Sequence, residues 1–289
     1  MRNWVFLGDS LTEGVGSKRI SYVTELVKQL RSSGCAAARG VNVHEFRLRH
    51  LEALNGDIQF NVAGFMNVDG QQNSSDVWLW NLACEGQTIE SDFDWLPLIG
   101  TVRPELVVVF RGSLESILRP AMLRDGEWPW WVPQSWRGHA AMDPRCYFST
   151  TWWRRAKQSS VDGLKQEVRL RLLKRRPGIP LIDLDQLASC QTELLRRLRA
   201  LGTRVLVLGL LPVDQARFPG SPEHFKAVNA RLREIASTEG AEFFDWAALL
   251  AAKGQHSELF YRDSFHPNEA GARALAEILR ERFCGEHSL

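Results

Sequence analysis

Short apolar runs alternate with amphipathic stretches along most of the chain. The runs are nearly continuous and predict buried strands, at residues 3–8, 105–110, 203–209 and 242–245. The amphipathic stretches place apolar residues at helical spacing or follow helix-start signals, and they predict helices near 19–33, 185–200, 222–239 and 267–283. Strands that are apolar on both faces and alternate with helices are typical of a parallel sheet covered on both sides. The pattern therefore predicts an α/β fold, a three-layer αβα sandwich with a central parallel sheet.

The segment 35–80 allows two interpretations. Residues 57–63 alternate between apolar and polar side chains as a strand does. Residues 78–80, Trp-Leu-Trp, also have the composition of a strand end. We expect an elaborated second strand region here, with both positions open.

Length and composition favour one domain. A chain of 289 residues with 44% hydrophobic residues can bury a full core, so we expect a single domain, 1–289, with an insertion at about 119–180. The formal net charge of +2 gives no general attraction to nucleic acid or to anionic membranes. No apolar run reaches the roughly 18 residues of a membrane-spanning helix, and the first apolar stretch is too short for a signal peptide. We therefore expect a cytoplasmic protein with no membrane insertion and no nucleic-acid partner.

The cysteines predict neither a disulfide framework nor a zinc site. They are odd in number, widely spaced and without a C-x-x-C pair. We expect free thiols and no metal or other cofactor. The five cysteines are Cys35, Cys84, Cys146, Cys190 and Cys284.

The expected insertion is rich in tryptophan and proline, a composition that does not favour a regular helix in its first part. Flat rings at this density suit a lid or wall over a site, where they would stack on a sugar or shelter an apolar chain. The alternative is that the rings form a small core for the insertion itself. The six tryptophans are Trp128, Trp130, Trp131, Trp136, Trp152 and Trp153.

A basic, helix-like stretch follows, with Val161, Leu164, Val168 and Leu172 on one face. Its other faces carry many more cations than the two anions Asp162 and Glu167. Such a surface either recognises a phosphate, a carboxylate or an acidic partner, or is simply a solvated charged face. The cations are Arg154, Arg155, Lys157, Lys165, Arg169, Arg171, Lys174, Arg175 and Arg176.

The first predicted strand ends in a polar turn. Gly8, Asp9 and Ser10 directly follow the apolar residues 4–7. Ligands of open parallel sheets bind outside the carboxyl ends of the strands, so we expect the Ser10 hydroxyl to face a crevice. A helix N-cap is the alternative role for a serine at this position.

A histidine with a nearby carboxylate stands near the other end of the chain. His266 lies three residues after Asp263 and directly before Pro267, a residue that favours a helix start. A nucleophilic serine needs an imidazole to take its proton and a carboxylate to hold that imidazole. Ser10, His266 and Asp263 are therefore the candidate catalytic triad. Alternatively, Asp263 and His266 only cap a helix.

The order of these motifs resembles that of the SGNH hydrolases, also called the GDSL esterase/lipase family, over residues 3–115 and about 185–283. The block Gly8-Asp9-Ser10-Leu11 matches in full, as does Asp263-x-x-His266. The family's loop Asn-x-Gly-x-x-Gly-x-Thr matches residues 81–88 except at Ala83. The resemblance implies a flavodoxin-like SGNH fold. It also implies an oxyanion hole formed by the backbone N–H groups of Ser10 and Gly86.

The third block of the family departs from the pattern. Where the family has Gly-x-Asn-Asp, this chain has residues 112–115, so Leu114 replaces an asparagine that would donate to the oxyanion and Glu115 replaces an aspartate. We expect Arg111 or Ser113 to replace the missing oxyanion donor and to contact the substrate. We also expect Asp9 to line the substrate site. For Arg111, a guanidinium facing the crevice would stabilise the oxyanion or bind a substrate carboxylate or phosphate. The alternative for Arg111 is an ion pair with Glu115 or Glu85.

The resemblance implies a serine esterase that hydrolyses a small carboxylic ester, such as an acyl or acetyl group on a sugar or metabolite, through an acyl-enzyme. Two other functions stay open. The same serine would serve an acyltransferase if the insertion excluded water. The change at Leu114 would also suit a binding protein with weakened catalysis. The sequence does not predict the oligomeric state.

Overall fold

One parallel sheet forms the centre of the protein. In this computed structural model, the described residues are 2–14, 20–33, 38–42, 77–138, 142–143 and 151–285. Within these ranges the sheet has six strands in the order β2-β3-β1-β4-β5-β6, and every neighbouring pair is parallel. The strands are β1 (Arg2–Gly8), β2 (Ala38–Asn42), β3 (Val77–Asn81), β4 (Leu106–Phe110), β5 (Arg204–Leu208) and β6 (Glu242–Phe244).

The central strands are apolar because both of their faces are covered. Every residue of β3 and β4 is buried, as are the last five residues of β1. Val5 of β1 lies between Trp80 of β3 and Val107 of β4. This explains why the sequence shows continuous apolar runs and no alternation.

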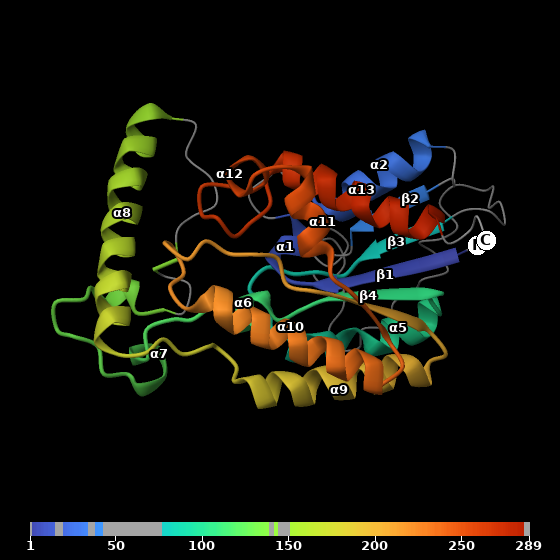
Figure 1. Cartoon of the computed structure of the whole chain (residues 1–289), viewed down its shortest axis with the longest axis horizontal. Helices are drawn as coiled ribbons and strands as arrows, with labels where there is room; N and C mark the ends of the chain where they lie inside the picture. Colours follow the sequence, from blue (N-terminus) through green and yellow to red (C-terminus); the bar gives the residue numbers. More distant parts are fainter. Residues whose placement is uncertain are drawn as a thin grey trace, which may run out of the picture.

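Two layers of helices cover the sheet (Figure 1). One face is covered by α2 (Tyr22–Ser32), α11 (Trp246–Lys253) and α13 (Glu269–Gly285), and the other by α5 (Leu96–Val102), α9 (Leu184–Ala200) and α10 (Ser221–Thr238). The αβα sandwich expected from the sequence is confirmed. In the described part of the chain, none of the helices combines the length and apolar character needed to cross a bilayer.

Short helices complete the described elements. They are α1 (Ser10–Glu13), η2 (Ile89–Trp95), α6 (Ser113–Ser116), α7 (Met122–Asp125), η3 (Gln134–Trp136) and α12 (His256–Leu259). Two of them, α1 and α6, begin within three residues after the strands β1 and β4. Polar residues at these two starts therefore lie at the same end of the sheet.

The long helix α8 (Trp152–Arg175) stands apart from the sandwich, beyond one end of the sheet (Figure 1). With the preceding loop it forms a small second core, made of Met122, Val132, Met142, Val168 and Leu172. Trp128 and Trp136 pack against this core, whereas the side chains of Trp130 and Trp152 are 91% and 79% exposed. The tryptophans thus divide between packing and exposure, and Trp152 and Trp153 begin a regular helix.

Some expectations fall outside the described residues. The candidate strand 57–63 is one of them, while the candidate 78–80 lies within β3. Cys35 and Cys146 also lie outside the described residues, and Cys84, Cys190 and Cys284 are free thiols.

Candidate active site

Ser10 begins helix α1 in a tight turn after β1. Asp9 is the N-cap, and its Oδ1 accepts a hydrogen bond from the Leu11 N–H at 2.9 Å. A Cβ at position 8 would overlap the Thr12 side chain, so only glycine fits there. Gly14 ends the helix with a φ of 88°. The N-cap role expected as the alternative for Ser10 therefore belongs to Asp9.

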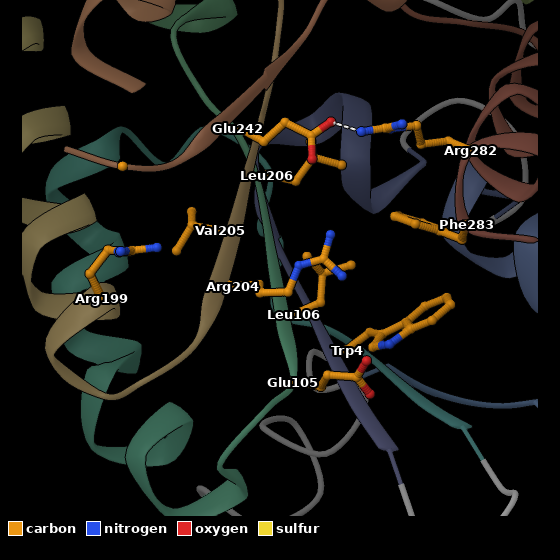
Figure 2. A pocket seen from close by; sticks show the side chains of 11 residues that line it. Trp4, Glu105, Leu106, Arg199, Arg204, Val205, Leu206, Glu242, Arg282 and Phe283 are labelled. Carbon is orange, nitrogen blue, oxygen red and sulfur yellow. Dashed lines mark hydrogen bonds and ion pairs between the residues drawn. The ribbon is translucent and has the colours of Figure 1, made fainter. Parts of the chain in front are cut away.

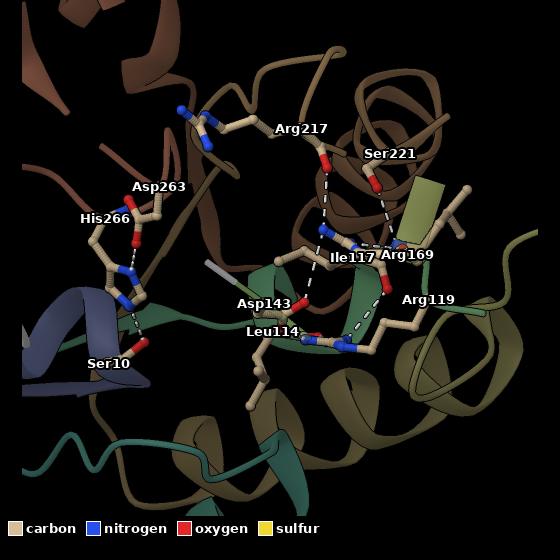
Figure 3. A network of polar contacts seen from close by, with 11 residues as sticks. Ser10, Leu114, Ile117, Arg119, Asp143, Arg169, Arg217, Ser221, Asp263 and His266 are labelled. Atoms are coloured by element: carbon tan, nitrogen blue, oxygen red, sulfur yellow. Dashed lines mark hydrogen bonds and ion pairs between the residues drawn. The ribbon is translucent and has the colours of Figure 1, made fainter. Parts of the chain in front are cut away.

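The three candidate triad residues lie in line (Figure 3). Ser10 Oγ is 2.8 Å from His266 Nε2, and His266 Nδ1 is 2.6 Å from Asp263 Oδ2. The Asp263 side chain is buried, and the His266 side chain is 16% exposed. An imidazole held between a hydroxyl and a buried carboxylate is the arrangement in which serine loses its proton most readily.

The loop that carries Asp263 and His266 is tightly folded. Asp263 Oδ1 accepts hydrogen bonds from the N–H groups of Phe265 and His266, both at 3.1 Å. Ser264, which directly follows Asp263, has a φ of 56°, which is uncommon for a residue with a Cβ. The Tyr261 N–H donates to the His266 carbonyl at 2.8 Å and closes the loop.

The loop 81–88 is attached to the Ser10 turn. The Cys84 N–H donates to the Gly8 carbonyl at 3.3 Å, and Asn81 Nδ2 donates to the Thr12 carbonyl at 3.1 Å. Gly86 is exposed and has a φ of 72°. An added Cβ at Gly86 would meet no atom within 4 Å, so the left-handed backbone, and not crowding, requires glycine there. Its role as an oxyanion donor stays a prediction.

The sequence as a whole matches the model of the GDSL-like lipase/acylhydrolase family over residues 6–274. The chain belongs to this family. It is therefore an ester-hydrolysing enzyme, and the resemblance in the four sequence blocks is confirmed at the level of the family. No protein with a curated annotation matches the sequence.

Solved structures of similar fold include several esterases. TesA is 16% identical with a TM-score of 0.53, and the match covers 100% of both chains. Axe2, an acetylxylan esterase from Geobacillus stearothermophilus, is 13% identical with a TM-score of 0.53, and the match covers 98% of this chain and 94% of Axe2. The psychrotrophic esterase EstA from Pseudoalteromonas sp. is 13% identical with a TM-score of 0.53, and the match covers 100% of both chains. At these identities the likeness shows the fold.

Arg111 does not face the crevice, so that expectation is wrong. Its side chain is fully buried, with Nε 2.8 Å and Nη2 2.5 Å from the two oxygens of Asp92. Its Nη1 donates to the Gln87 carbonyl at 2.7 Å. The alternative partners, Glu115 and Glu85, do not form the pair either. A buried guanidinium needs a buried carboxylate with matching geometry, and Asp92 on η2 supplies it.

The other two residues expected to bind substrate are also buried. The Asp9 side chain is fully enclosed at the N-cap of α1, and Ser113 is buried at the start of α6. Their expected role in substrate binding stays a prediction. Leu114 is buried as well and brings no donor. Leu114 therefore contributes packing to the site.

The buried charges behind the site support the loop that contains Gly86. Glu115 Oε1 accepts from the Ile89 N–H at 2.8 Å and Oε2 accepts from the Gly112 N–H at 3.1 Å. Burial raises the pKa of Glu115 to about 7, although the nearby Arg111 opposes the shift. Burial likewise raises the pKa of Asp9, again opposed by Arg111. Glu115 thus joins the second and third blocks, a role that its place in the motif did not predict.

Two cavities lie at opposite ends of the strands. A narrow one beside the candidate triad is lined by Ser10, Leu11, Ile20, Tyr22, His266 and Pro267. A larger one, of about 140 Å³, is lined by the first residues of β4, β5 and β6 and by α13. Figure 2 shows Arg204 and the Glu242–Arg282 ion pair on its walls. Because the sheet is parallel, this larger cavity is at the end away from Ser10.

Proposed function

We propose that the protein is a serine esterase for a small carboxylic ester, with Ser10 as nucleophile, His266 as general base and Asp263 as its partner. The observation that carries the proposal is the 2.8 Å contact between Ser10 Oγ and His266 Nε2, with Asp263 2.6 Å from the other ring nitrogen. Two distant parts of the chain converge there, Ser10 near one end and the Asp263–His266 loop near the other, which a helix cap does not require.

The proposed reaction has two steps. His266 Nε2 takes the Ser10 proton as Oγ attacks the ester carbonyl, and the same proton passes to the departing alcohol. Water then attacks the acyl-enzyme with His266 again as base, which releases the acid and restores Ser10. Throughout, Asp263 holds the tautomer with the proton on Nδ1 and stabilises the imidazolium.

The backbone N–H groups of Ser10 and Gly86 are the proposed oxyanion donors. The fixed turn at Ser10 and the attachment of the Gly86 loop to that turn support this role. Leu114 cannot add a third donor, and loss of one donor typically costs about 10²–10³-fold in kcat. We therefore propose a slow esterase, with a catalytically weakened binding protein as the second candidate.

The substrate is proposed to carry a short acyl group. The cavity beside Ser10 is narrow, which argues against a long acyl chain at this position. Axe2, of similar fold, is named as an acetylxylan esterase, so acetyl esters of sugars are the first substrates to test.

A phosphonate reagent tests the proposal directly. EstA, one of the similar structures, is described as inhibited by monoethylphosphonate. A fluorophosphonate should label the wild-type protein on Ser10, and Ser10→Ala should lose both the label and turnover of p-nitrophenyl acetate. Ser160→Ala, at an exposed serine of α8, is the control and should behave as wild type. If the wild-type protein takes the label but does not turn over the ester, the weakened binding protein is favoured. If Ser10→Ala is labelled as strongly as wild type, Ser10 is not the nucleophile.

A further inference from the structure

The helix α8 presents a polar stripe to the body of the protein. Asp162, Gln166 and Arg169 lie at spacings of four and three residues, so they share one face of the helix. Asp162 and Arg169 are buried, although both are charged. A helix that only covers a core would place apolar side chains on this face. The stripe therefore needs an explanation other than burial of apolar area.

The first residue of the stripe contacts the loop that carries the histidine. Asp162 forms an ion pair with Arg262, 100 residues further along the chain. The side chains of the pair are 8% and 19% exposed, so solvent screens it little. Arg262 directly precedes Asp263, the proposed partner of His266. The ion pair thus ends one residue from the proposed triad.

The other two residues of the stripe hold a second segment beside the same loop. Gln166 Nε2 and Arg169 Nη1 both donate to the Arg217 carbonyl, at 2.9 Å and 3.1 Å. Figure 3 shows Arg169 reaching this carbonyl. Phe218 directly follows Arg217, and the Arg169 guanidinium carbon lies 4.7 Å from the centre of the Phe218 ring. Phe218 in turn packs against Phe265, with ring centroids 6.0 Å apart. This second route ends beside His266.

The loop needs such support because its backbone is unusual. Ser264 has a left-handed φ of 56°, and residues with a Cβ keep such a conformation only when their surroundings hold it. Many contacts of the loop are local, such as the Tyr261–His266 hydrogen bond and the one between His256 Nε2 and the Ser264 carbonyl at 3.2 Å. Local bonds fix the shape of the loop but not its distance from Ser10. Contacts from α8 supply a reference outside the loop.

We propose that the stripe of Asp162, Gln166 and Arg169 sets the position of the Asp263–His266 loop against Ser10, with Asp162 as the principal positioning residue. The inference rests on the proposed function of the triad. Hydrogen bonds and ion pairs are directional, so a polar stripe fixes a neighbour more closely than apolar contacts do. The insertion is then part of the catalytic machinery through the placement of His266, without touching the substrate.

Asp162→Asn tests the proposal, because it removes the charge and keeps the shape of the side chain. A displacement of about 1 Å can cost up to about 10²-fold in rate, so we expect kcat to fall about 10- to 100-fold with little change in KM. Glu167→Gln is the matched control. It neutralises the other acid of α8, whose ion pair with Arg171 is exposed, and kcat should stay as in wild type.

Counting active sites separates positioning from a loss of folded protein. Titration with the fluorophosphonate gives the number of competent Ser10 residues, and kcat is expressed per titrated site. If Asp162 acts by positioning, Asp162→Asn should titrate with as many active sites as wild type, and each site should turn over slowly. Normal turnover per site in Asp162→Asn would overturn the proposal, whether or not fewer sites remain. If that variant does not fold, Arg262→Lys keeps the charge and shortens the reach, and the same criterion applies.

A second readout does not depend on turnover. The NMR signal of the His266 ring proton that lies between Nδ1 and Asp263 reports the geometry of that contact, and it should move in Asp162→Asn and not in Glu167→Gln. An unchanged signal in Asp162→Asn would overturn the inference even in an inactive protein. Failure of the proposed function gives a different result, because wild type itself would then neither take the label nor hydrolyse esters.

Discussion

The histidine loop and the third block place polar residues at the same end of the sheet, with opposite outcomes. In the histidine loop, His266 is partly exposed and contacts Ser10 across the chain. At the third block, Glu115 and the preceding residue Arg111 are buried, and they contact the backbone behind the site and Asp92 respectively. The position after a strand is therefore not sufficient to give a polar residue a catalytic role. A polar residue gains such a role only when its side chain has access to the crevice, and that access depends on the packing around the strand end.

The largest expected effect comes from the histidine loop. Asp263→Asn should lower kcat by about 10⁴-fold, because an amide favours the wrong histidine tautomer. The fold should persist, since the oxygen of the new side-chain amide can still accept the Phe265 and His266 N–H groups that Asp263 Oδ1 accepts now. Kinetics with p-nitrophenyl acetate and a thermal melt measure the two effects. Asp185→Asn, at an exposed acid of α9, is the control. A rate within tenfold of wild type would exclude Asp263 from the triad.

Substitution of the buried Arg111 should lower the stability of the fold more than it lowers kcat. Arg111→Met leaves Asp92 buried and without its cation, and breaking a buried pair in this way typically costs about 3–5 kcal/mol. Ser10 and His266 are untouched, and the change reaches the site only through the Gln87 carbonyl beside Gly86, so folded molecules should keep most of their kcat. Urea unfolding and kinetics per folded molecule check both statements.

An exposed pair provides the contrast for this measurement. Arg197 pairs with Glu193 on the surface of α9, where Arg197→Met should cost about 1 kcal/mol or less. A large fall in kcat per folded molecule of Arg111→Met, with normal stability, would return Arg111 to the crevice and reverse the comparison.

The sequence predicted Ser10 and the histidine loop better than the buried pair of Arg111 and Asp92. Ser10, Asp263 and His266 stand in short motifs next to strand or helix ends, and motif and periodicity together place them at one edge of the sheet. Asp92 carries no such signal, because it lies 19 residues before Arg111 and the pair forms only when η2 packs on the strand end. Burial of a charged residue is a property of the tertiary structure.

The proposed role of α8 has a signal in the sequence that apolar periodicity does not capture. The apolar spacing of α8 predicts the helix and leaves Asp162 and Arg169 on its charged faces, either for recognition of an anionic group or as a solvated surface. Asp162, Gln166 and Arg169 lie on one face of the helix. Their spacing of four and three residues is the same as that of an apolar stripe. A regular polar face indicates a docking surface only when a partner is known, and the partner Arg262 is 100 residues away.

The smallest expected effect tests the third block itself. Leu114→Asn restores the side chain that the family pattern has at this position and adds a donor that leucine lacks. Leu114 is buried and its site is not built to orient an amide, so the new donor should regain only part of a donor's usual 10²–10³-fold, about tenfold in kcat. Leu114→Ala is the matched control, because it opens the same space without a donor. If alanine raises kcat as much as asparagine, the gain comes from room for the substrate. If asparagine leaves kcat unchanged or lowers it, position 114 does not face the oxyanion, and the third block of this chain belongs wholly to the buried half of the comparison.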